Sequence, residues 1–157
     1  MNYNWRTIDI DQYDEDAYTE DEILASFESQ MPADQAEALA QTQNTDVRNL
    51  LTRGEYGNAL LRALEDPPYG RHLTQAKAII TQTVVDTLSL IRATDIESTI
   101  STLNFDQKDL LMKYLYAGLA KPEVYNSGVL LTWHEKLTKI AGTGCIVRVM
   151  SDKRTVL

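Results

Sequence analysis

The residues with the most evident catalytic potential are His134 and Glu135, which stand next to each other in Leu-Thr-Trp-His-Glu-Lys. A zinc protease motif requires a second histidine four residues after the first, so that both imidazoles bind the metal from one helix face. That position is Thr138, and His72 is the only other histidine of the sequence. We therefore interpret His134 as a packed or hydrogen-bonded structural residue and predict no metal site.

A second candidate for chemistry is the segment around Cys145. Gly142 and Gly144 could begin a dinucleotide-binding loop, but Val147 occupies the place of the third glycine and no strand is predicted before it. Cys145 has apolar neighbours, among which a thiol is normally unreactive, and a single cysteine permits no internal disulfide. We therefore predict no catalytic residue, no cofactor and no enzyme activity.

The charges of the chain are segregated. The 157 residues carry 23 acids and 15 bases, a net charge of −8, which disfavours nucleic acid as a partner. Residues 1–37 hold 11 of the acids and only one base, Arg6. The sequence therefore divides into an acidic N-terminal arm, residues 1–37, and a body, residues 38–157. A segment so charged and so poor in apolar residues is expected to be mobile in isolation.

Aromatic and apolar residues within the arm indicate that it binds another protein. Residues 8–11 alternate isoleucine and aspartate, so an extended chain presents one apolar face. Tyrosine and tryptophan are common in interface cores because they bury large areas and keep a polar group. A solvating tail without contacts is the alternative. The residues expected to contact a partner are Trp5, Ile8, Asp9, Ile10, Asp11, Tyr13, Ile23 and Phe27.

Helix signals account for the remainder of the chain. Thr19 and Glu22 have capping-box spacing, and Asp34–Leu64 reads as two helices joined at Gly54. Residues 74–92 are rich in Thr, Val and Ile but are too long for a typical strand, so we predict a buried helix. Two further helices are expected to begin with caps at Thr94 and Asp106. Another should span 128–141 and turn Leu130, Trp133, Leu137 and Ile140 inward. Residues 145–150 are predicted to be helical too, because a strand there would have no partner.

These signals predict an all-α protein: an α-α superhelix of about seven helices with an extended acidic arm. Tyr114 and Tyr116 fall on different faces of one helix, so at least one of them should meet solvent or another subunit. The body residues expected at an interface are Tyr114, Tyr116, Trp133, His134 and Arg148.

Several segments, in order along the chain, resemble the family of smallest subunits (subunit 5) of the actin-related protein 2/3 complex. The acidic segment Ile8–Glu15 is similar to the amino-terminal motif of that family, and Ala59–Pro68 is similar to its first helical hairpin. The most specific matches lie in the body: Asp109–Gly118, Leu131–Lys136, Gly142–Val149 and Lys153–Val156.

The resemblance implies a helical, non-catalytic subunit of a seven-subunit assembly that nucleates branched actin filaments. It implies that the body docks on the subunit-4 homologue and the β-propeller subunit, that the arm tethers actin-related protein 2, and that actin filaments are contacted through the complex. It also implies a cytoplasmic location in the actin cytoskeleton, in cortical patches or leading-edge networks, without membrane or nucleic-acid partners. Residues 30–43 depart from the glycine-rich linker of the family because they are rich in alanine and glutamine.

A free-standing adaptor is the alternative function. Such a protein would bind peptides in the groove of its helical superhelix and would carry the arm as an acidic tail.

Overall fold

The computed structural model of the chain describes residues 19–156. The predicted arm contacts Trp5, Ile8, Asp9, Ile10, Asp11 and Tyr13 lie outside the described residues. Within residues 19–156 the chain forms eight helices and no strand, which confirms the all-α prediction. The helices are α1 (Glu20–Ala25), α2 (Ala33–Thr52), α3 (Tyr56–Ala63), α4 (Thr74–Leu90), α5 (Ile96–Thr102), α6 (Phe105–Leu119), α7 (Ser127–Ala141) and α8 (Thr143–Ser151).

The helix starts show which capping signals the chain uses. At α1, the Thr19 hydroxyl accepts from the Glu22 amide while the Glu22 carboxylate accepts from the Thr19 amide, so the predicted capping box is present. The α6 cap is Asn104 and not Asp106, because the Asn104 side chain accepts from Gln107 N at 2.8 Å.

The predicted cap of α5 is also wrong. The helix exists, but the Thr94 hydroxyl donates to the Asp95 carboxylate at 3.0 Å and not to the helix start, and Asp95 makes no side-chain cap. None of the helices in the described part of the chain is long and apolar enough to span a membrane.

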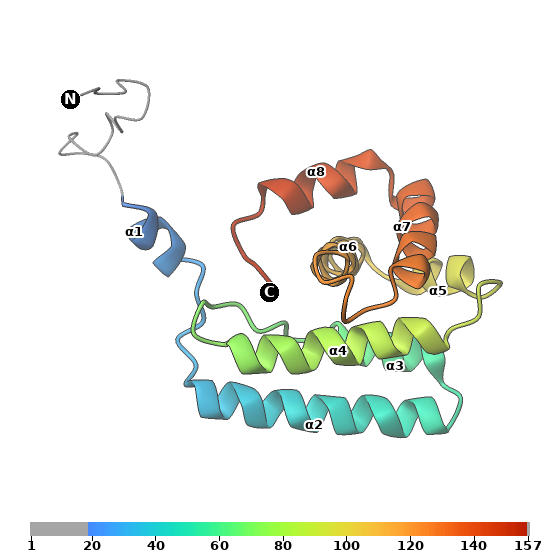
Figure 1. Cartoon of the computed structure of the whole chain (residues 1–157), viewed down its shortest axis with the longest axis horizontal. Helices are drawn as coiled ribbons and strands as arrows, with labels where there is room; N and C mark the ends of the chain where they lie inside the picture. The colour runs from blue at the N-terminus through green and yellow to red at the C-terminus, as the bar shows by residue number, and fades with distance from the viewer. Residues whose placement is uncertain (1–18, 157) are drawn as a thin grey trace.

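Helices α2, α3 and α4 pack together as one group, and α4 also contacts α6 and α7 (Figure 1). The α4 sequence is rich in β-branched residues, yet it is a buried helix as predicted, with Ala76, Ile80, Val84 and Leu88 in the core. Helix α2 begins at Ala33 and buries Ala36 and Ala40, so the stretch rich in alanine and glutamine is helical and packs on the body.

Helix α6 is enclosed by its neighbours, and Figure 1 shows it end-on near the centre of the molecule. It contacts α4, α7 and α8. Eight of its 15 residues are buried, and they fall on all sides of the helix. Gly118 allows the closest approach, because a Cβ there would lie 2.7 Å from Leu130 Cδ1 of α7. The buried residues of α6 are Leu110, Leu111, Met112, Lys113, Tyr114, Leu115, Ala117 and Gly118.

Helices α7 and α8 meet at Gly142, whose φ of 76° lies in the region that favours glycine. Three of the four inward predictions on α7 are confirmed, since Leu130, Trp133 and Leu137 are buried. Ile140 is 38% exposed, because it falls at the last turn of α7, where the chain turns into α8. The ambiguous segment at residues 145–150 is helical, as predicted.

After α8 the chain returns along α6 and α4 as an extended segment, residues 152–156, which we call the strap (Figure 1). Val156 is buried, and its carbonyl accepts from the Thr81 hydroxyl of α4 at 3.4 Å. Lys77 of α4 donates to the Thr155 hydroxyl at 3.2 Å. The strap therefore closes the side of α6 that the helices leave open.

One ion pair fastens the strap to α6. The ammonium of Lys113, whose side chain is 9% exposed, donates to Asp152 at 2.6 Å and to the Arg154 carbonyl at 3.1 Å. Burial raises the pKa of the Asp152 carboxyl, but hydrogen bonds from Arg154 and Lys113 outweigh it, so the pKa lies well below its usual range. Lys113 and Arg154 also lie 5.1 and 5.2 Å from the centroid of the Tyr69 ring.

We predict that Asp152→Asn lowers the free energy of unfolding by about 2 kcal/mol at pH 7, the scale of a hydrogen bond between charged groups. A carboxyl whose pKa is depressed by folding stabilises the protein above its unfolded pKa, about 3.9, and this contribution is lost as the pH falls through and below that value. The difference between variant and parent should therefore shrink below about pH 4. Urea unfolding at several pH values measures it.

The matched control is Glu123→Gln, a charge removal at an exposed position in the turn before α7. It should change the free energy of unfolding by less than about 0.5 kcal/mol. A constant difference between Asp152→Asn and the parent down to acid pH would show that the Asp152 charge does not hold the strap.

Candidate partner-binding surface

Two of the five predicted body residues belong to the core and not to the surface. Tyr114 is 1% exposed, and Trp133 is fully buried with its indole N–H donating to the Leu88 carbonyl of α4 at 3.1 Å. Helix α6 is covered on the side where Tyr114 lies, and α7 turns Trp133 toward α4. These side chains are therefore unavailable to a partner, and we leave them out of the surface described below.

Tyr116 and His134 form a pair between α6 and α7 at the surface. The Tyr116 hydroxyl and His134 Nε2 are hydrogen-bonded at 3.1 Å, and the rings meet edge to face with centroids 5.4 Å apart. Both side chains are half-buried. The hydrogen bond confirms the structural interpretation of His134, and the half-burial confirms that one of the two α6 tyrosines reaches the surface.

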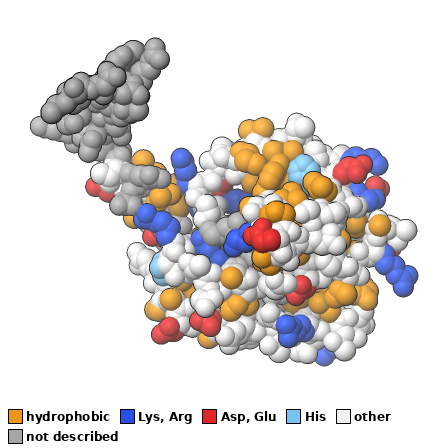
Figure 2. All heavy atoms as spheres, in the orientation of Figure 1, with side chains coloured by type: hydrophobic (Ala, Val, Ile, Leu, Met, Phe, Trp, Pro, Cys, Tyr) orange, Lys and Arg blue, Asp and Glu red, His pale blue; other side chains and the backbone are white. Residues whose placement is uncertain are grey.

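Helix α8 exposes two large apolar side chains, and one of them lines a groove together with Tyr116. Val147 is 65% exposed and Met150 is 61% exposed. Met150, Val149 and Tyr116 line a groove of about 260 Å³ that ends at the strap. Figure 2 shows hydrophobic side chains gathered around a histidine on the upper part of this face. We call Tyr116, His134, Val147, Val149 and Met150 the α8 surface.

The sequence pattern of α8 could have indicated this exposure. Four of five consecutive residues, 145–149, are apolar, whereas a helix of nine residues packed on one side buries only one stripe. Cys145 takes the buried position, so the next residues along the helix turn toward solvent. Sequence reasoning directed to the tyrosines and charges did not find Val147 and Met150.

Arg148 lies on another side of α8 and is engaged within the chain. Its guanidinium donates to both carboxylate oxygens of Asp109, at 2.6 and 2.8 Å, and stacks 4.1 Å from the centroid of the Phe105 ring. The hydrogen bonds from Arg148 outweigh burial and lower the pKa of Asp109. Whether a partner contacts Arg148 stays a prediction.

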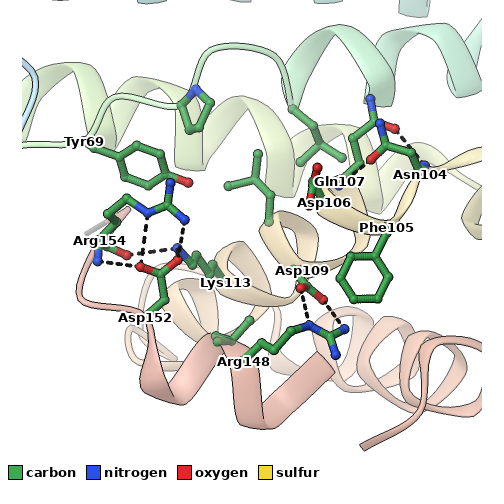
Figure 3. A pocket seen from close by; sticks show the side chains of 14 residues that line it. Tyr69, Asn104, Phe105, Asp106, Gln107, Asp109, Lys113, Arg148, Asp152 and Arg154 are labelled. Atoms are coloured by element: carbon green, nitrogen blue, oxygen red, sulfur yellow. Dashed lines mark hydrogen bonds and ion pairs between the residues drawn. The ribbon is translucent and has the colours of Figure 1, made fainter. Parts of the chain in front are cut away.

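These three residues line a groove of about 620 Å³ between the start of α6, α8 and the loop before α4. Figure 3 shows the Arg148–Asp109 pair at one end and the Lys113, Asp152 and Arg154 cluster at the other. Phe105 is 60% exposed at the edge of this groove. The bases that line this groove, Lys113, Arg148 and Arg154, each form an ion pair with a carboxylate of the same chain.

Cys145, the cysteine of the sequence, is buried in the described part of the chain. Burial, with a smaller effect of Asp109, raises the pKa of the Cys145 thiol to about 12, so it is protonated at neutral pH. No group of three or more potential metal ligands occurs among residues 19–156. What this part of the chain offers is exposed apolar surface bordered by paired charges, an arrangement suited to binding a protein.

Two of the predicted arm contacts, Ile23 and Phe27, fall within the described residues. Ile23 lies in α1, and Phe27 follows the end of that helix. Ile23 is 43% exposed and Phe27 is 45% exposed. Phe27 lines a separate cleft of about 380 Å³ together with residues of the loop before α4 and of the strap. The structure thus places both side chains where a partner could reach them, and their role stays a prediction.

Comparison with known proteins identifies relatives of the whole chain. The family model described as ARP2/3 complex 16 kDa subunit (p16-Arc) matches residues 4–156. Actin-related protein 2/3 complex subunit 5-B of Xenopus laevis is 34% identical over 156 residues, which cover 99% of this chain and 97% of the relative. Subunit 5 of Saccharomyces cerevisiae is 33% identical over 159 residues, 99% of this chain and all of the relative. The subunit 5-like protein of Homo sapiens is 30% identical over the same share as the Xenopus relative.

We predict different effects on the free energy of unfolding when the hydroxyl is removed from each of the two tyrosines of α6. Tyr116→Phe loses the hydrogen bond to His134 and should lower the free energy of unfolding by about 1 kcal/mol. Tyr114→Phe should leave it unchanged or raise it, because the buried Tyr114 hydroxyl has no hydrogen-bond partner among the described residues. Urea unfolding of the two variants measures the contrast, and a larger loss for Tyr114→Phe would contradict the arrangement of α6.

Proposed function

This chain belongs to the family of 16 kDa subunits of the ARP2/3 complex, and on that basis we propose that it supports actin filament nucleation and branching as a non-catalytic subunit. Its partners are the other subunits of the complex, and it acts in the cytoplasmic actin cytoskeleton. The body docks within the assembly while the acidic arm holds actin-related protein 2. The observation that carries the proposal is the exposed apolar α8 surface of a chain that is related along its whole length to these subunits.

Docking of the body is assigned to the α8 surface. Exposed Val147 and Met150 would lose contact with water when a partner covers them, at a gain of roughly 25 cal/mol for each Å² of apolar area. The Tyr116–His134 pair adds two rings that keep polar groups at their edges. The subunit-4 homologue and the β-propeller subunit are the proposed partners of the body.

Tethering is assigned to the arm. Its acids give electrostatic attraction to a basic partner surface, and its alternating isoleucines give apolar contact. A bound arm keeps actin-related protein 2 at a high effective concentration while the assembly changes shape, without fixing one geometry. Helix α2 begins at Ala33 and buries Ala36 and Ala40, so we assign the tether to the part of the arm before Ala33.

We predict that Val147→Asp with Met150→Asp prevents incorporation into the complex, because two carboxylates would be buried against the partner without counter-ions. The matched control is Leu39→Asp on α2, an apolar residue with 51% exposure in another part of the body. Purification of the complex through a different subunit measures how much of each variant is retained.

Equal retention of the double variant and the parent would remove the α8 surface from the proposal, and equal loss with Leu39→Asp would show that the docking surface lies elsewhere. Capture of a varied set of proteins by the parent chain, with no fixed set of complex subunits, would favour the adaptor.

We predict that deletion of residues 1–18 leaves body docking intact and loosens actin-related protein 2. Such a deletion removes six of the eight predicted arm contacts and keeps all of the described residues 19–156. The subunit composition of the purified complex and its rate of filament nucleation measure the effect. Full retention of actin-related protein 2 with an unchanged nucleation rate would contradict the tether.

A further inference from the structure

The two ends of the described chain meet at one cleft. Leu24, Phe27 and Glu28 line it from the α1 side, Tyr69, Gly70 and Arg71 from the loop before α4, and strap residues 152–155 from the other side. Its volume is about 380 Å³. Figure 2 shows Lys and Arg side chains gathered on this side of the molecule, close to α1. We call this hollow the strap cleft.

The chain between α1 and α2 is attached to the body beside the strap cleft. Ser29 N donates to the Tyr69 carbonyl at 2.9 Å, Arg71 pairs with Glu28 at 2.7 Å, and His72 Nε2 lies 3.0 Å from the Met31 carbonyl. These contacts fix the place at which the arm leaves the body. The chain that follows α1 is therefore held at the edge of the strap cleft.

The chemistry of the strap cleft is apolar on one wall and basic on another. Leu24 and Phe27 provide the apolar wall, and Phe27 is 45% exposed. Among the described lining residues Arg71 is paired with Glu28 and Arg154 with Asp152, and Lys153 adds a third, exposed base. The cleft thus suits an extended segment that carries apolar and acidic side chains on alternate sides.

Residues 8–13 of the arm, Ile-Asp-Ile-Asp-Gln-Tyr, are such a segment. Five residues separate Tyr13 from Thr19 and span up to about 17 Å when extended, whereas α1, with six residues, is only about 9 Å long. The arm is therefore long enough to return along α1. We propose that residues 8–13 occupy the strap cleft of their own chain when no partner holds them, so that a partner of the arm must compete with the cleft.

This inference rests on the proposed function of the arm, but its test uses the isolated full-length chain. Gln12→Cys introduces one reactive thiol, because Cys145 is buried and its thiol has a raised pKa. A nitroxide on residue 12 should cause loss of amide NMR signals at Gly70, Arg71 and 153–155, and should spare α5. Raising the salt from about 0.1 M to about 1 M shortens the Debye length from about 10 Å to about 3 Å and should restore the signals.

A charge reversal in the cleft supplies the matched comparison. Lys153→Glu should abolish the signal loss, whereas Lys121→Glu, an equal charge change at an exposed site in the turn after α6, should preserve it. Absence of signal loss at the cleft, or loss that survives both Lys153→Glu and high salt, would overturn the proposal.

The experiments also distinguish contact with a second copy from contact within one chain, and failure of the cleft contact from failure of the tether. Signal loss on ¹⁵N-labelled chains that carry no nitroxide, mixed with nitroxide-labelled chains, would assign the cleft to a second copy and overturn the intramolecular contact. A positive result with the isolated chain, together with full retention of actin-related protein 2 after deletion of residues 1–18, would keep the cleft contact and overturn only the tether.

Discussion

Burial of α6 on all sides is the constraint on which the other elements depend. A helix with apolar residues around its whole circumference is stable in water only when neighbours cover every face. Helices α4, α7 and α8 supply three of these neighbours, and the strap supplies the last. Lys113 lies on the face of α6 that the strap covers. Its aliphatic chain is buried, and its ammonium donates to Asp152 and to the Arg154 carbonyl. The chain after α8 thus helps to cover α6 although it has no regular structure, and its Val156 is buried in the core.

Much of this fold could be predicted from the sequence because length and spacing decide between helix and strand. The β-branched α4 is the clearest case, since 17 residues with an apolar stripe outweigh local strand propensity once tertiary packing is available. Exact caps were harder, because Asn104 and Asp106 are both good caps and only the backbone path chooses between them. The role of the strap could not be predicted, since its hydrogen bonds join residues about 40 and 75 positions apart, such as Lys113 with Asp152 and Thr81 with Val156.

The candidate surface could also be predicted only in part, because helical spacing shows which residues share a face but not which face is buried. Helical geometry places Tyr114 and Tyr116 on different faces of α6, but it does not say which of them faces the core. That depends on how α4 and α7 pack against α6. Arg148 and His134 were found as polar residues in distinctive segments, yet both are paired within the chain. The proposed docking surface is instead marked by apolar residues that the fold leaves uncovered, Val147 and Met150. The division into an acidic arm and a nearly neutral body stays a prediction at its boundary, because α2 already begins at Ala33.

The contact between Gly118 and Leu130 has a consequence for how such chains can diverge. Leu130 is fully buried, so it cannot swing outward to admit a methyl group at position 118, and the axes of α6 and α7 are held at the separation that a glycine permits. Substitutions at the two positions are therefore expected to occur together. A relative with alanine at position 118 should carry a smaller side chain than leucine at position 130. Val85 of α4, 3.6 Å from the same point, extends this coupling to a third helix.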